Sequence, residues 1–137
     1  MAIFGIGAYY GERGDVSQDF IRKGVACVGW TQAEAPSLHK LLRHIRIGDI
    51  IYIKTDVPSP GLTIKAIGVV TNDEIQMDED LDASIPVKWV WKGHDKLGRL
   101  NDKLNVRNNT LYEEYFPQVQ ARVIDLLLSK LILIEGA

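Results

Sequence analysis

Short segments rich in β-branched residues recur along the sequence and limit it to a fold built on a β-sheet. Residues 25–30, 50–54, 62–71 and 87–91 each read as a strand, because Val, Ile and aromatic residues crowd them and glycine or proline stands nearby. Within the third segment, Gly68 is expected at a bulge or at a close approach of two strands. The remaining elements must pack against the sheet that these segments imply.

Helical spacing appears between and after these strands. Residues 16–23 follow a capping-box pattern, and 36–45 place four apolar side chains on one stripe that leaves His39 outside. A second capping box predicts a short helix over 110–116, and an amphipathic helix follows Pro117. The order of elements predicts a mixed α+β fold, in which a small curled sheet or barrel is flanked by short helices.

Three further segments are less regular. The acidic stretch 72–84 and the polar stretch 93–109 are expected as exposed loops, and 131–134 either continues the last helix or forms a closing strand. Trp89 and Trp91 stand two residues apart and are predicted to share one face of their strand.

The composition excludes several classes of protein. The 137 residues suit a single domain over 1–137, and a formal net charge of −2 argues against binding nucleic acid by bulk electrostatics. Cys27 is the only cysteine, which rules out an intramolecular disulfide and a zinc site built on cysteine pairs. The sequence has no signal-peptide pattern and no apolar run of the roughly 18 residues that a membrane span needs, so we expect a cytoplasmic protein that binds no membrane.

Residues with catalytic chemistry are few and scattered. His39 and His44 lie five apart, a spacing that turns them away from a shared metal on a helix, and His94 stands alone. The serines lack a nucleophile-elbow context, and the acidic residues of 72–84 lack the spacing of a calcium loop. We therefore expect no catalytic residues, no metal site and no cofactor, and a binding module rather than an enzyme.

The order of the segments resembles a known superfamily. A strand ending in Gly29-Trp30 leads to a Leu-rich helix, and Gly48-Asp49 then opens a hydrophobic strand. Residues 61–70 and the later strand at 87–90 complete a pattern that covers about residues 16–92. This arrangement is similar to the EVE and YTH domains of the PUA-like superfamily, to which ASCH domains are more distantly related.

The resemblance implies a PUA-like barrel with a pocket that holds a modified base. Trp30 aligns with the first cage tryptophan of YTH domains, and Lys54-Thr55 lie where EVE domains carry polar pocket residues. The segment of the second YTH cage tryptophan matches the acidic loop, so Tyr9 or Tyr10 is expected to take its place. An aromatic face of this kind stacks on a base and contributes about 1–3 kcal/mol. The predicted ligand-binding residues are Trp30, Tyr9, Tyr10, Gly29, Thr31, Lys54, Thr55 and Trp91.

Basic residues are expected to contact phosphates, which position a nucleic acid without reading its sequence. The predicted contacts are Lys40, Arg43, Lys92, Arg99 and Arg107. The expected partner is a modified nucleic acid or nucleotide, and the resemblance also implies a separate effector protein that acts beside the reader. Two other interpretations stay open. In one, the tryptophans are core residues of a protein-interaction or regulatory module; in the other, the chain is a small RNA- or DNA-acting enzyme of the ASCH type.

Overall fold

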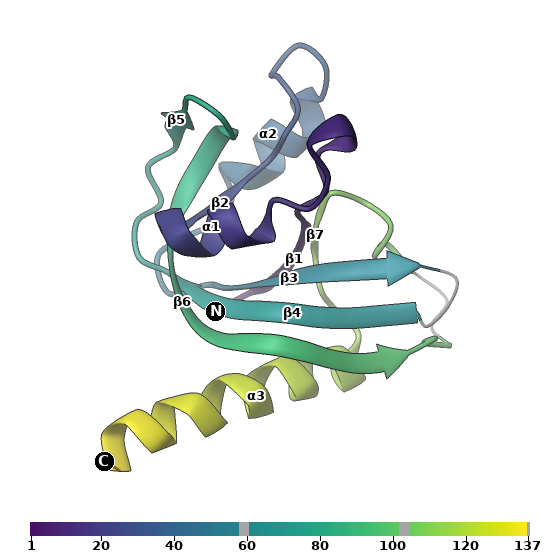
Figure 1. Ribbon diagram of the computed structural model, residues 1–137, viewed down its shortest axis with the longest axis vertical. Coiled ribbons are helices and arrows are strands. Elements are labelled where there is room, and N and C mark those ends of the chain that lie inside the picture. Colours follow the sequence, from purple (N-terminus) through teal and green to yellow (C-terminus); the bar gives the residue numbers. More distant parts are fainter. Residues whose placement is uncertain (58–60, 102–104, 137) are drawn as a thin grey trace.

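A seven-stranded mixed sheet organises the chain (Figure 1). The computed structural model describes residues 1–57, 61–101 and 105–136, with side chains up to Leu131. Across these residues the strands are β1 (Ile3–Gly7), β2 (Val25–Cys27), β3 (Ile50–Val57), β4 (Gly61–Val70), β5 (Gln76–Asp78), β6 (Asp82–Gly98) and β7 (Leu111–Glu113). The helices are α1 (Ser17–Lys23), α2 (Pro36–Leu42) and α3 (Pro117–Gly136), and a short 3-10 helix covers Gly11–Arg13.

Pairing along one long strand makes the sheet curl. The strand order is β2-β6-β4-β3-β1-β7, with β5 paired to β6 off this path, and only β1 and β3 run parallel among the described pairs. The first residues of β6 pair with β2 and β5, and the rest pair with β4. Register shifts interrupt the β4–β6 pairing at three places, and such bulges sharpen the twist of a sheet. The sheet therefore curves into a half-barrel (Figure 1).

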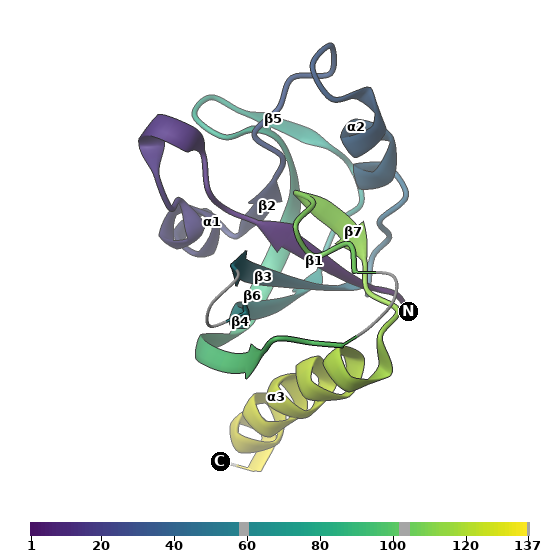
Figure 2. The same ribbon diagram turned by 90° about the vertical axis from the view of Figure 1, so that its right-hand side faces the viewer.

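Apolar side chains fill both faces of the sheet. On one face, α1 and α2 cover a cluster that includes Phe20, Ile51 and Ile53. On the other face, α3 packs against a second cluster that includes Ile50 and Tyr52 (Figure 2). A strand that is buried on both faces needs apolar residues at successive positions, which explains the unbroken apolar run at the start of β3.

The predicted α+β architecture around a curled sheet is confirmed. The helices expected over 16–23 and 36–45 and after Pro117 are present as α1, α2 and α3. The segment 131–134 continues α3. Gly68 lies at a register shift of β4 against β6, as its place in the sequence predicts. None of the helices in the described part of the chain is long and apolar enough to cross a membrane.

The short helix predicted over 110–116 is wrong. The segment instead forms β7, which pairs antiparallel with β1 at the edge of the sheet. Gly7 N donates to the Thr110 carbonyl at 2.8 Å, so a strand from the other end of the chain holds this segment extended. A capping pattern is a local signal, and pairing with β1 outweighs it.

The loops expected over 72–84 and 93–109 are also wrong in part. The first contains β5 and the start of β6. Leu81, in the turn between the two strands, and Ala83, on β6, are both buried. The second begins as strand, because β6 continues in pairs with β4. Exposed and half-buried residues alternate along 92–97, which is the pattern of a strand with one side facing solvent.

Trp89 and Trp91 enter different core clusters, contrary to the predicted shared face. Between them β6 gains one residue relative to β4, at the register shift next to Gly68. The Trp89 indole joins the cluster under α1 and donates to the Phe20 carbonyl at 3.1 Å, whereas Trp91 joins the cluster under α3. The bulge therefore decides which layer each tryptophan enters.

Gly68→Ala is expected to lower the free energy of unfolding by about 1–3 kcal/mol. A Cβ atom at this position would lie 2.7 Å from the Lys88 carbonyl oxygen and 2.5 Å from Val87 Cγ1, closer than side chains approach. Gly7→Ala is the matched control, because the nearest atom to its added Cβ is Lys54 Nζ at 3.7 Å. Urea denaturation of both variants measures the difference, and equal losses would show that the bulge tolerates a side chain.

Candidate ligand-binding site

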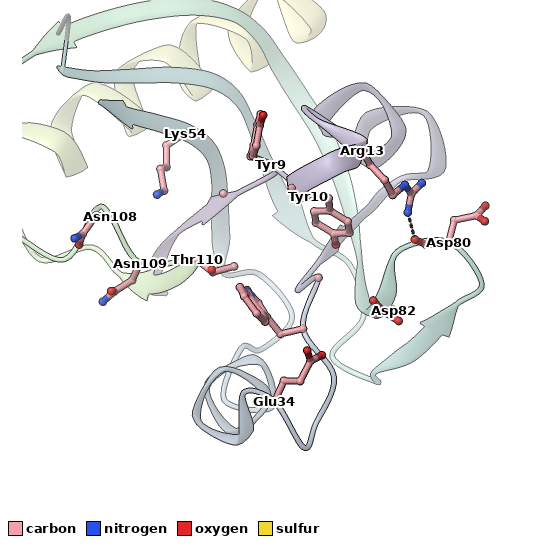
Figure 3. A pocket seen from close by; sticks show the side chains of 14 residues that line it. Tyr9, Tyr10, Arg13, Glu34, Lys54, Asp80, Asp82, Asn108, Asn109 and Thr110 are labelled. Atoms are coloured by element: carbon pink, nitrogen blue, oxygen red, sulfur yellow. Dashed lines mark hydrogen bonds between the residues drawn. The ribbon is translucent and has the colours of Figure 1, made fainter. Parts of the chain in front are cut away.

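A cavity of about 560 Å³ opens beside the end of β1 and the middle of β3 (Figure 3). Its lining comes from Lys54 on β3 and from the segments 7–13, 29–34, 80–82 and 108–110. The volume falls in the range of about 300–1,000 Å³ that is usual for small-molecule sites. Because the four segments are far apart in the sequence, only the tertiary fold assembles this site.

Trp30 occupies a loop that hydrogen bonds hold in place. The Thr31 N–H donates to Glu34 Oε1 at 3.0 Å, and the Glu34 N–H donates to Thr31 Oγ1 at 3.2 Å, a reciprocal pair that closes the turn. His39 Nε2, on α2, donates to the Trp30 carbonyl at 2.6 Å. The prediction that His39 lies outside the buried stripe is wrong, since the residue is only 7% exposed. With its backbone fixed in this way, the Trp30 side chain remains half-exposed on the cavity wall.

The Tyr10 ring forms a second wall. It meets the Phe20 ring edge to face, with 6.2 Å between centroids and 78° between planes, and its hydroxyl donates to the Leu81 carbonyl at 3.1 Å. Gly29 lies against the ring, because an added Cβ there would come within 2.8 Å of it. Burial raises the pKa of the Tyr10 hydroxyl well above its ordinary value, so the group stays a neutral donor. Tyr9, by contrast, is an exposed part of the lining.

Lys54 brings a buried ammonium group to the cavity. The residue follows a register shift between β3 and β4, at which β4 carries one extra residue, Lys65, and it is 8% exposed. Its Nζ donates to the backbone carbonyl of Arg107 and lies 5.6 Å from the centroid of the Tyr112 ring. Burial lowers the pKa of the Lys54 ammonium, and the Asp56 carboxylate acts in the opposite direction. An ammonium group has three N–H donors, and the hydrogen bond to Arg107 uses one of them.

A buried ion pair fixes the segment that accepts the Lys54 hydrogen bond. Arg107 Nε and Nη2 donate to the two carboxylate oxygens of Glu114, each at 2.9 Å, and both side chains are 2% exposed. The Tyr52 hydroxyl donates to Glu114 Oε1 at 2.6 Å and shares a 2.8 Å hydrogen bond with the Tyr112 hydroxyl. Burial raises the pKa of both tyrosine hydroxyls. The predicted phosphate contact of Arg107 does not fit this burial, because its guanidinium lies inside the protein.

Acidic side chains outnumber basic ones on the cavity lining. The charged lining residues are Arg13, Lys54, Glu34, Asp80 and Asp82. Because its net charge is negative, the lining does not concentrate phosphate groups. A neutral flat group with hydrogen-bonding edges finds both donors and acceptors there. In the described ranges, no group of three or more His, Cys, Asp or Glu side chains is placed to hold a metal ion.

The structure brings most of the predicted ligand-binding residues together. Trp30, Tyr9, Tyr10, Gly29 and Lys54 all line the cavity. The other three lie elsewhere: Thr31 closes the turn described above, Thr55 lines a neighbouring cavity of about 250 Å³, and Trp91 packs under α3.

The remaining predicted phosphate contacts are spread over the surface. Lys40 and Arg43 are exposed on α2 and at its end, next to the helix residue that holds the Trp30 loop. Lys92 lines a different cavity, which also contains Asp15 and His94. Arg99 is exposed near Asn108, at the edge of a further cavity. These cations form no continuous track, and only the pair on α2 adjoins the Trp30 loop.

Sequence reasoning missed much of the polar lining. The missed residues share no motif or periodicity, and most of them lie in loops or at the end of a short element: Arg13, Glu34, Asp80, Asp82, Asn108, Asn109 and Thr110. The sequence around Asp82 reads as one solvated acidic run, yet the residue adopts a left-handed backbone with φ of 66° where β5 turns into β6. The paired asparagines indicate a turn and nothing about what the turn faces.

The family comparison covers the whole of this site. A family described as a domain of unknown function, DUF8426, matches residues 6–114, a range that includes every residue of the cavity lining. No curated protein matches the sequence at a significant level. Because the match spans well over half of the 137 residues, this protein belongs to the DUF8426 family.

Proposed function

We propose that this protein recognises a flat heterocycle, a modified base or nucleotide of a nucleic acid, in the cavity around Trp30. The observation that carries the proposal is the Trp30 indole, which is 48% exposed on the wall of a cavity of about 560 Å³. A large apolar ring that is left accessible inside a concave site is a stacking surface for any base. The resemblance to EVE and YTH domains supports the same interpretation, because YTH domains hold a modified base in an aromatic cage that includes a tryptophan.

The proposed mechanism is recognition without chemistry. Stacking on Trp30 supplies affinity, and the Tyr10 ring and exposed Tyr9 bound the space beside it. The polar side chains of the lining hydrogen-bond the edges of the base and select among bases. A base that belongs to a duplex must leave the stack first, which costs a few kcal/mol and favours modified or unpaired bases.

The rest of a polynucleotide would remain outside the cavity. The cavity lining carries three acidic and two basic side chains, so it does not concentrate phosphates, whereas Lys40 on the neighbouring helix α2 and Arg43 at its end are exposed cations that attract them. This division, with a base inside and phosphates outside, suits a reader that acts beside a separate effector protein.

We also propose a reducing, cytoplasmic setting for the protein. The single cysteine, Cys27, is buried as a free thiol, and burial raises the pKa of this thiol to about 12.

Trp30→Ala is expected to weaken base binding by about 5- to 150-fold, which corresponds to the loss of one stacking contact. Wild-type protein and the variant are titrated with fluorescently labelled oligonucleotides, methylated and plain, and binding is followed by anisotropy. Because the indole is half-exposed and its loop is held through backbone groups, the variant should unfold at nearly the same urea concentration as the wild type.

Tyr115→Ala is the matched control, since Tyr115 is a 72% exposed aromatic residue outside the cavity. It should bind oligonucleotides as the wild type does. Equal binding by the wild type and Trp30→Ala would refute the stacking role. Saturable binding to a protein and never to a nucleotide would favour an interaction module, and cleavage of the oligonucleotide that survives stringent purification would favour an enzyme.

A further inference from the structure

Lys54 places an ammonium group, with three hydrogen-bond donors, at one end of the cavity. Lys54 is 8% exposed as a residue, and within the described residues its ammonium group donates to one backbone carbonyl, that of Arg107. Figure 3 shows the side chain directed toward the segment of Asn108, Asn109 and Thr110. Buried donors without acceptors cost free energy, so N–H groups left over at a cavity wall favour a ligand that accepts hydrogen bonds.

Space for such an acceptor exists beside the ammonium. Gly7, the last residue of β1, lines the cavity there, and a Cβ on it would lie 3.7 Å from Lys54 Nζ. Because Gly7 has no side chain, the wall next to Nζ stays open to a ligand atom. The ion pair of Arg107 and Glu114 holds the carbonyl that positions Lys54, so the ammonium is fixed before any ligand arrives.

The charge of the lining decides which acceptor fits. A phosphate would be attracted by Lys54 and Arg13, but it would face three carboxylates, those of Glu34, Asp80 and Asp82, on the same lining. A neutral oxo group, in which a carbonyl carbon belongs to the ring, offers two lone pairs to the ammonium without adding negative charge. An amino group at the same place would instead turn its own N–H donors toward those of Lys54.

We infer that the cavity takes a heterocycle that presents a neutral oxo group to Lys54, and that it discriminates against bases with an amino group at that edge. This inference rests on the proposed function and adds the class of base. Adenine, which has no oxo group, is then a poor ligand, and 6-oxopurines and pyrimidinones are the favoured class.

Inosine and adenosine test the inference directly, because inosine carries an oxo group where adenosine carries an amino group. Wild-type protein should bind inosine at least about tenfold more tightly, the factor expected of one hydrogen bond to a charged group. In Lys54→Met the preference should fall to less than about twofold, through weaker binding of inosine. Isothermal titration calorimetry gives both affinities for each variant.

Lys96→Met is the matched control, since Lys96 is an exposed strand residue outside the cavity lining and its loss should leave the preference intact. Trp30→Ala should weaken both nucleosides by a similar factor. If both nucleosides bind equally and both depend on Trp30, the oxo inference is wrong and the proposed function stands. If neither nucleoside binds the wild type, both are wrong.

Two further measurements complete the test. Inorganic phosphate is added as a competitor. If phosphate displaces inosine at a concentration similar to that of inosine, the site binds an anion rather than a neutral oxo group, and the inference is overturned. Infrared difference spectra of bound inosine, labelled with 18O at the oxo group, report on the wild type even if Lys54→Met does not fold. A carbonyl band at lower frequency than that of free inosine in buffer supports a hydrogen bond from Lys54. A band at the same frequency contradicts it.

Discussion

Glu114→Ala is expected to lower the free energy of unfolding by about 3–5 kcal/mol, because it breaks a buried ion pair. The variant takes the Glu114 carboxylate away from the buried Arg107 guanidinium, and it removes the acceptor of the Tyr52 hydroxyl and of the Phe116 N–H. Removing one member of a buried ion pair costs far more than the pair itself contributes. Urea denaturation followed by far-UV circular dichroism measures the loss.

Asp19→Ala is the control for this prediction. It breaks the ion pair between Asp19 and Arg22, whose side chains are 36% and 71% exposed, and exposed pairs contribute at most about 1 kcal/mol. A double variant, Arg107→Met with Glu114→Leu, should recover much of the stability, because it removes both buried charges together. Similar losses for Glu114→Ala and Asp19→Ala would show that Glu114 is not buried in solution.

Phe20→Ala is expected to lower the free energy of unfolding by about 3–5 kcal/mol. The ring is fully buried in the cluster beneath α1, and truncation leaves a cavity there. The loss should also reach the ligand site, because the Phe20 ring supports the edge of Tyr10, which lines the cavity. The variant is therefore expected to bind the heterocycle more weakly even at temperatures where it remains folded.

Met77→Ala provides the comparison, since Met77 is 73% exposed on β5 and such changes usually alter stability by less than about 0.5 kcal/mol. Thermal unfolding and oligonucleotide anisotropy are measured for both variants. Reduced stability of Phe20→Ala with unchanged binding would separate the core from the site and contradict the coupling through Tyr10.

The sequence predicts the fold well where local pattern and tertiary packing agree. The apolar runs at 50–54 and 62–71 become central strands because both faces of the sheet are covered, and the helix after Pro117 has a true apolar stripe. Prediction fails where a distant partner decides the outcome. The capping box at 110–113 is a genuine helix signal, yet Leu111–Glu113 form a strand because they pair with β1.

The aromatic part of the candidate site is predictable, together with Gly29 and Lys54. Trp30 and the tyrosines at 9 and 10 are visible as large rings next to glycines, and all three line the cavity. Its polar side chains come from loops at 80–82 and 108–110, which no periodicity marks. Their chemistry depends on which loops meet, and that is a property of the sheet topology rather than of any local motif.

The position of β1 in the sheet determines when the chain can complete its fold during synthesis. This strand, Ile3–Gly7, lies between β3 and β7, so its residues must find partners about 50 and about 110 positions further along the chain. Such long-range closure slows folding, because chain entropy is lost before distant contacts form. During translation, the edge of β1 that β7 will cover stays open until Leu111–Glu113 emerge from the ribosome. The ligand cavity needs the loop just before β7, so it cannot be complete until that loop has been synthesised.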